Sequence, residues 1–157
     1  MAETRGTTDL RRAGIEHRLH AYRYTGNGPV AAEAAAALGV DPSALFKTLV
    51  VVAGDEPVFA LLPGDHELST KLLAAAAGAK HAQLADRHTA ERVTGYQIGG
   101  ISPLGSRRRL RTFVDESAAA LPSILLNAGA RGLIVEAETA ALLAHLEAAT
   151  TKLTRQS

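Results

Sequence analysis

The hydrophobic and polar positions of the chain follow two periods, and together they predict short helices mixed with short strands. Near the start, the polar residues Thr7–Asp9 predict the N-cap of a helix that runs through Glu16. The alternation over 18–24 then predicts a strand. Pro29 and Gly39 bracket an alanine-rich segment, which predicts a second helix between them.

The middle of the chain predicts a hairpin followed by two helices. Residues 41–43, Asp-Pro-Ser, are typical of the start of a short helix. Apolar runs over 48–52 and 58–62 flank a turn, so we expect paired strands there. Helices are expected over 68–77 and 86–93, the first ending at a glycine.

The last third of the chain predicts three more strands and a final helix. A strand is expected over 112–115, and a hairpin is expected from 123–126 and 132–136. An alanine- and leucine-rich helix should cover 137–149, with the last residues frayed. Because strands and helices follow no regular alternation, the pattern predicts a single α+β domain over 1–157 with a mixed sheet.

Composition narrows the possible chemistry. The 157 residues are 46% hydrophobic and 21% charged with a net charge of +1, which is typical of a globular chain without a global field for nucleic acid. The absence of cysteine excludes disulfides, thiolate zinc sites and a protein thiol nucleophile. The six histidines form no metal-ligand pattern, and no nucleotide-binding glycine motif occurs, so neither a metal nor a cofactor is expected.

The ends and the apolar runs give no sign of a membrane or a secretory route. The first twelve residues are polar and charged and contain no apolar signal core. The longest apolar runs are too short to span a bilayer. We therefore expect a cytoplasmic protein.

A glycine-rich stretch over 94–105 dominates the candidate chemistry. Five of its twelve residues are Gly or Pro, which is too many for a helix or a central strand. Gly99 and Gly100 can bring main-chain N–H groups close to a ligand, and Pro103 stiffens the exit. The alternative is a plain turn between strands. Four arginines follow and could bind phosphates, although they could equally be a solvated run of charge: Arg107, Arg108, Arg109 and Arg111.

Lys47 lies between Phe46 and Thr48 at the start of an apolar strand. Its ammonium must either reach out to solvent or meet a ligand such as a phosphate or an ester carbonyl. Tyr22, on the polar face of the first predicted strand, could line the same pocket, or it could simply pack.

Three segments together resemble the YbaK/EbsC family of aminoacyl-tRNA deacylases, which is related to the editing domain of bacterial prolyl-tRNA synthetases. They are Phe46–Val51, the glycine-rich stretch Thr94–Gly105, and Arg131–Leu133. The resemblance covers about residues 9 to 150. It implies a mixed, curved, partly barrel-like sheet with helices packed outside.

The resemblance also implies site residues. Lys47 matches the family's essential lysine, Tyr22 matches a pocket tyrosine, and Gly99–Pro103 matches a GxxxP loop. Catalytic roles would fall to Lys47, Gly100 and Ser102, and substrate binding to Tyr22, Phe46, Thr48, Gly99, Ile101, Pro103, Asn127 and Gly129. The chain departs from the family pattern at Ile134, where Asp is frequent, and at Asn127–Gly129, where Ser-Gly-Gly is frequent.

The implied function is trans-editing of mischarged tRNA, above all removal of cysteine from Cys-tRNA(Pro). In YbaK-like enzymes the substrate thiol is thought to attack its own ester. The implied partners are tRNA(Pro), whose phosphates the arginines would contact, and prolyl-tRNA synthetase. The alternatives are a water-dependent Ala-tRNA(Pro) deacylase, a tRNA- or synthetase-binding module without catalysis, and a generic small-molecule pocket.

Overall fold

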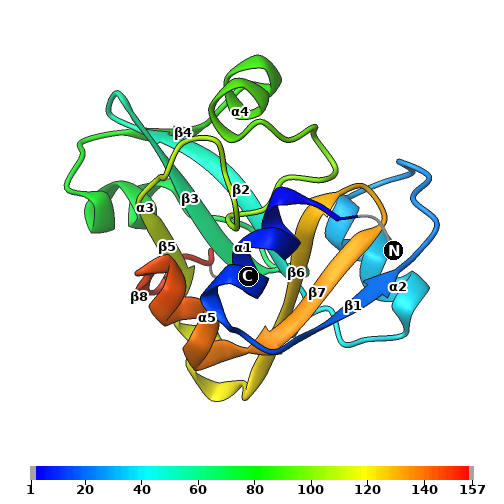
Figure 1. Ribbon diagram of the computed structural model, residues 1–157. Helices are drawn as coiled ribbons and strands as arrows, with labels where there is room; N and C mark the ends of the chain where they lie inside the picture. Colours follow the sequence, from blue (N-terminus) through cyan, green and yellow to red (C-terminus); the bar gives the residue numbers. More distant parts are fainter. Residues whose placement is uncertain (1–2, 156–157) are drawn as a thin grey trace.

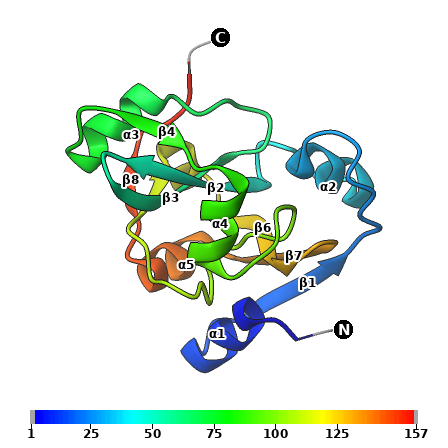
Figure 2. The ribbon, with the colours of Figure 1, turned by 90° about the horizontal axis from the view of Figure 1, so that it is seen from above.

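The computed structural model describes residues 3–155 of the chain (Figure 1). In chain order the helices and strands are α1 Arg5–Ala13, β1 His17–Ala21, α2 Val30–Leu38, β2 Phe46–Ala53, β3 Glu56–Pro63, α3 Thr70–Ala77, β4 Ala82–Leu84, α4 Arg87–Thr94, β5 Thr112–Asp115, the 3-10 helix η1 Glu116–Ala120, β6 Ser123–Ala130, β7 Leu133–Glu138, α5 Thr139–Leu146 and β8 Ala149–Thr151. The expected α+β class is confirmed. Figures 1 and 2 place the helices outside the strands, with α2 on one side, away from α3.

The strands form two sheets. One is antiparallel with the order β1-β7-β6, and the other is mixed with the order β4-β2-β3-β5-β8, in which β5 is parallel to both neighbours. A parallel bridge between Leu45 and Leu125 joins the two sheets. The mixed pairing is as expected, whereas the strands of the described residues close no barrel.

Apolar side chains from both sheets meet in one central core. Phe46, Leu61 and Val114 come from the five-stranded sheet, and Leu126 and Val135 come from the three-stranded sheet. All five are almost fully buried. Burying one such side chain contributes about 1.5–3 kcal/mol, so this core fixes how the two sheets face each other.

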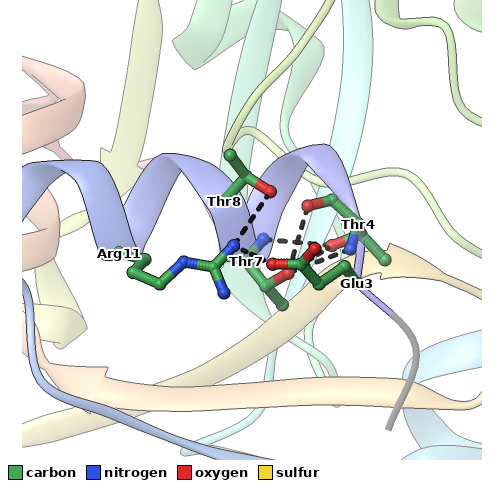
Figure 3. A network of polar contacts seen from close by, with 5 residues as sticks. All are labelled: Glu3, Thr4, Thr7, Thr8 and Arg11. Atoms are coloured by element: carbon green, nitrogen blue, oxygen red, sulfur yellow. Dashed lines mark hydrogen bonds and ion pairs between the residues drawn. The ribbon is translucent and has the colours of Figure 1, made fainter.

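The first helix begins earlier than expected. Thr4 is its N-cap, and Thr4 and Thr7 exchange hydrogen bonds: the Thr7 N–H donates to the Thr4 hydroxyl (3.0 Å), and the Thr4 N–H donates to the Thr7 hydroxyl (2.9 Å) (Figure 3). The helix ends at Gly14 rather than at Glu16, because Gly14 is left-handed (φ 71°). The expected cap residue Asp9 instead accepts the N–H of Gly105 (3.0 Å).

Other ends were predicted correctly where the signal is local. Gly39 and Gly78 end α2 and α3 in the left-handed conformation, and the Asp86 carboxylate caps α4 by accepting the Thr89 N–H (2.8 Å). The hairpins β2–β3 and β6–β7 are confirmed. The predicted helix start at 41–43 is wrong, because this segment forms only a turn, in which the Asp41 carboxylate accepts the Ser43 N–H (2.9 Å).

The end of the chain differs most from the prediction. The helix α5 is shorter than 137–149, since Ala137 belongs to β7 and Ala149 begins β8. The fraying expected for the last residues does not reach Leu153, and residues 156–157 lie outside the part of the chain that the structure describes. Leu153 is fully buried, and its N–H donates to the Asp115 carboxylate (2.9 Å).

Candidate active site

A cavity of about 330 Å³ lies between α2, the start of β2, the glycine-rich loop and the strands β6 and β7. Its wall is mostly apolar, with Ala31 and Ala34 from α2 and Ile134 from β7 among the lining residues. The lining includes six of the predicted site residues: Phe46, Lys47, Thr48, Gly99, Ile101 and Asn127. Segments up to about 100 residues apart in sequence thus meet at one place.

The cavity runs along an open edge of β2. This strand pairs with β3 along its whole length, but with β4 only from Val51 onward. The Val50 carbonyl accepts the Ala85 N–H (2.9 Å), so Thr48, two residues earlier, turns its own main-chain groups toward the same side. The Thr48 hydroxyl is buried with no hydrogen-bond partner in the described residues. Thr48 therefore offers unused polar groups beside the cavity.

Lys47 is half-buried at this edge and lines the cavity. Burial lowers the pKa of its ammonium, while the nearby carboxylates of Glu67 and Asp65 act in the opposite direction. Among the described residues Lys47 forms no ion pair within 4.0 Å. Its charge remains available to an anionic ligand at the cavity.

The glycine-rich loop is held in place by Asn127. The Asn127 amide donates to the Gly99 carbonyl (3.0 Å), and its oxygen accepts the N–H groups of Gly129 (2.7 Å) and Ala130 (3.2 Å). The N–H of Gly100 is already used in a turn, since it donates to the Gln97 carbonyl (2.9 Å). This bond leaves Gly100 less suited than its neighbours to the donor role expected of it.

Five expected site residues lie outside the cavity lining, namely Gly100, whose turn is described above, and the four that follow. The Ser102 side chain is fully buried, and its hydroxyl accepts the Leu104 N–H (3.1 Å). Pro103 lines a different hollow of about 670 Å³ between α1 and α5. Gly129 packs against the Tyr96 ring, and Tyr22 packs with α2 and Ile134. Burial raises the pKa of Tyr22, and the nearby Glu33 carboxylate raises it further.

The arginine run divides into free and engaged side chains. Arg107 and Arg108 are exposed, and Arg109 pairs with the equally exposed Glu147 (3.1 Å). Arg111 forms two parallel hydrogen bonds to Glu56 (both 2.9 Å) and a third to the Ala77 carbonyl (2.9 Å). Its guanidinium is therefore committed to holding β3 and the end of α3.

Sequence reasoning missed the wall supplied by α2 and two residues at the cavity rim. The small buried residues Ala31, Ala34 and Ala35 repeat at helical spacing, which indicates a packed face but not a ligand. Tyr24 and Arg131 lie beside the glycine-rich loop. The Arg131 Nε donates to the Ile98 carbonyl (2.9 Å). This bond joins residues 33 apart, and no local pattern predicts it.

Comparison with known proteins decides the family. Residues 25–144 match the model of the aminoacyl-tRNA editing domain. The chain belongs to this family. Its membership confirms the resemblance and the expected enzyme class, an aminoacyl-tRNA deacylase.

Two curated relatives illustrate the range of this editing domain. The chain is 33% identical over 130 residues to the "Putative Cys-tRNA(Pro)/Cys-tRNA(Cys) deacylase EbsC" of Enterococcus faecalis, covering 82% of the chain and 79% of that protein. It is 34% identical over 96 residues to the proline–tRNA ligase of Geobacter metallireducens, covering 61% of the chain. The matched region is only 16% of that ligase.

Solved structures share the fold of this editing domain. One is described as a "putative trans-editing enzyme for prolyl tRNA synthetase", with a TM-score of 0.84 and 22% identity over 99% of the chain and 100% of the other. Hypothetical protein APE2540 has a TM-score of 0.87 and 24% identity, over 97% of the chain and 100% of the other.

Residues 3–155 show neither a membrane-spanning helix nor a cluster of metal ligands. No helix there is long and apolar enough to cross a membrane. No group of three or more His, Cys, Asp or Glu residues there is placed to hold a metal ion.

Proposed function

We propose that the chain removes the amino acid from mischarged tRNA(Pro) in trans, with Cys-tRNA(Pro) as its main substrate. The observation that carries the proposal is the composition of the cavity wall: one lysine, mostly apolar side chains, and no carboxylate, histidine or thiol. The EbsC relative supports cysteine as the amino acid. In this proposal residues 1–157 act as one domain in the cytoplasm.

The wall favours a substrate that supplies its own nucleophile. The position after Arg131-Gly132-Leu133, where the family often has a carboxylate, is the buried Ile134. A water-dependent route needs a general base within hydrogen-bond reach of the attacking water. The lining residues include no carboxylate, histidine or thiol for that role, and their one ionisable side chain, Lys47, is assigned below to the tRNA.

In the proposed reaction the cysteinyl sulfur attacks the carbonyl carbon of its own ester. A C–S bond forms, the bond from the carbonyl carbon to the ribose oxygen breaks, and the thiol proton ends on that oxygen. The tRNA leaves with a free hydroxyl, and the amino acid leaves as a cyclic thiolactone. The protein contributes position and dipoles, effects that can supply several kcal/mol, on the order of the known terms for proximity and oxyanion stabilisation.

Each cavity residue then has a role suited to its contacts. The Lys47 ammonium would hold the terminal phosphate or the ribose of the tRNA. Main-chain N–H groups of the glycine-rich loop would orient the ester, with Gly99 a better donor than Gly100 because of the Gln97 bond. The small side chains Ala31 and Ala34 would receive the side chain of the amino acid.

The tRNA body would be held by the exposed arginines Arg107, Arg108 and Arg109. The pair between Arg109 and Glu147 is exposed on both sides, so a phosphate can replace the carboxylate at little cost. Arg111 is not included, because its guanidinium is held by Glu56 and the Ala77 carbonyl. The 34% identity to a proline–tRNA ligase supports prolyl-tRNA synthetase as the partner that produces the mischarged substrate.

The same wall could also admit an alanyl side chain, because its residues offer a methyl group apolar contacts. This favours Ala-tRNA(Pro) as the second candidate substrate, cleaved by water without a base from the wall. The two candidates differ in whether the reaction needs sulfur.

The direct test is release of amino acid from purified Cys-tRNA(Pro) and Ala-tRNA(Pro) by the wild type and Lys47→Ala. Lys71→Ala is the matched control, because Lys71 is an exposed lysine on α3. We expect loss of cysteine with the wild type and the control, and at least a tenfold slower loss with Lys47→Ala. Release of alanine alone would move the assignment to the second candidate, and full activity of Lys47→Ala would overturn the role of the lysine.

A further inference from the structure

A cation–π pair of side chains, Arg131 and Tyr24, lies beside the cavity. The guanidinium carbon of Arg131 is 5.2 Å from the centre of the Tyr24 ring, which is a cation–π contact. The same guanidinium donates from Nε to the Ile98 carbonyl (2.9 Å). Arg131 is exposed, whereas the half-buried Tyr24 supports it from one side.

The loop that carries Tyr24 is fixed on both sides. On one side, Gly99 leaves room for the phenol: a Cβ at Gly99 would lie 2.8 Å from the Tyr24 hydroxyl. On the other side, the Glu33 carboxylate of α2 accepts the N–H groups of Thr25 (2.7 Å) and Gly26 (3.2 Å). Tyr24 is thus held between the glycine-rich loop and the segment attached to α2.

Two of these contacts place the pair at the rim of the cavity. Ile98, whose carbonyl holds Arg131, and Gly99, against which Tyr24 packs, both line the cavity. Ile98 is fixed at its other end as well, because its N–H donates to the Glu91 carboxylate (2.8 Å). The exposed Arg131 side chain is therefore held at the rim by its contacts with Ile98 and Tyr24.

The substrate would bring a flat group, its terminal adenine, to this place. Under the proposed function, the aminoacyl group enters the cavity, so the ribose that carries the ester and its adenine base must lie at the rim. Arginine planes and aromatic rings are the surfaces on which proteins stack unpaired bases. We propose that Arg131, supported by Tyr24, stacks on the terminal adenine of the tRNA and so positions the ester.

This inference rests on the proposed function, and its test compares two substrates. One is Cys-tRNA(Pro) with its terminal adenosine, and the other is the same molecule with an abasic terminal nucleotide. For wild type, kcat/KM should fall about 5- to 150-fold when the base is removed, the range for loss of one stacked base. Arg131→Ala should lose a similar factor on the normal substrate and almost nothing further on the abasic one.

A purely structural role predicts a different result. If Arg131 only holds the loop through Ile98, Arg131→Ala slows both substrates by the same factor, and that result overturns the inference. Arg131→Lys keeps the charge without the plane, so it should behave like Arg131→Ala; full recovery by lysine would point to a phosphate contact and would also overturn it. Tyr24→Ala removes the supporting ring, so it should reduce the difference between the two substrates in the same direction as Arg131→Ala does.

A binding measurement separates this inference from the proposed function. Uncharged tRNA(Pro) carrying 2-aminopurine at its terminal position should change its fluorescence on binding to wild type, but not to Arg131→Ala. Arg23→Ala is the matched control, because Arg23 is also exposed, lies next to Tyr24 and forms no ion pair in the described chain. A response without any amino acid release would refute the deacylase proposal alone, and no response with wild type would refute the stacking.

Discussion

Gly99 is the glycine of the loop that packs against Tyr24, and alanine there tests the geometry of the cavity rim. Its φ of +95° is unfavourable for any L-residue, and the new Cβ would lie 2.8 Å from the Tyr24 hydroxyl and 3.0 Å from the ring carbon that bears it. The backbone cost is about 1–2 kcal/mol. Crowding a well-packed site adds about 1–3 kcal/mol.

A matched glycine separates these two costs. Gly78 ends α3 with a similar φ of +77°, but a Cβ there has nothing within 4 Å. Gly78→Ala should therefore lower the free energy of unfolding by the backbone cost alone. Gly99→Ala should lower it further, with a fall in Tm of about 2–4 °C for each kcal/mol in a chain of this size.

The assay is urea unfolding of both variants, alone and combined with Tyr24→Ala. Removing the phenol relieves the crowding, so in that background Gly99→Ala should cost no more than Gly78→Ala does. The reasoning is refuted if Gly99→Ala is as stable as wild type, or if its cost is the same with and without Tyr24.

Three further predictions concern charge. Burial lowers the pKa of Lys47, so as the pH rises the ammonium is lost before the usual lysine value of 10.5 is reached, and activity that needs the ammonium should fall with it. The measurement is kcat/KM against pH after subtraction of spontaneous hydrolysis. In Lys47→Arg this fall should disappear, because arginine stays charged. Neutralising the exposed Arg107 and Arg108 together should reduce the slope of log K for tRNA binding against log salt by about 1–2. Arg111→Gln should leave this slope unchanged and instead lower stability, because the Arg111 guanidinium is bonded to Glu56 and the Ala77 carbonyl. An unchanged slope in the double variant would mean that the tRNA binds elsewhere. Burial alone would raise the pKa of Asp115, but hydrogen bonds from Ser117, Leu153 and Thr154 outweigh it and lower that pKa. The ionised Asp115 therefore stabilises the fold above about pH 4, and this stabilisation is lost as the pH falls through the lowered pKa. In Asp115→Asn the free energy of unfolding should fall less steeply at acidic pH than in the wild type, and an unaltered fall would contradict this role.

The parts of the fold predicted from sequence are those with local causes. Gly39 and Gly78 end their helices because a left-handed residue follows the last turn, and Asp86 begins α4 because its carboxylate meets an N–H three residues later. The strand β8 has no such signal. Its three residues are a strand only because they pair with β5, more than thirty residues earlier in the chain.

Among the residues of the candidate site, too, those with a local signal in the sequence could be predicted, and those placed by distant contacts could not. Lys47 and Thr48 stand out because polar residues begin an apolar strand, and both line the cavity. Ser102 and Pro103 belong to the same glycine-rich loop, but Ser102 is fully buried and Pro103 lines the hollow between α1 and α5, and no local pattern in the sequence indicates either placement. Arg131 joins the site through the Ile98 carbonyl, a contact that depends on the arrangement of the loop in space.

The central claim is that the substrate's own sulfur breaks the ester at a site whose wall offers no carboxylate, histidine or thiol. The most direct measurement is the single-turnover rate of tRNA release from tRNA(Pro) carrying cysteine, serine or alanine, with the wild-type protein. The account predicts that cysteine is released about 100-fold faster or more, because only its side chain is an effective nucleophile held beside the carbonyl. Equal rates for the three amino acids would contradict it and would assign the attack to water.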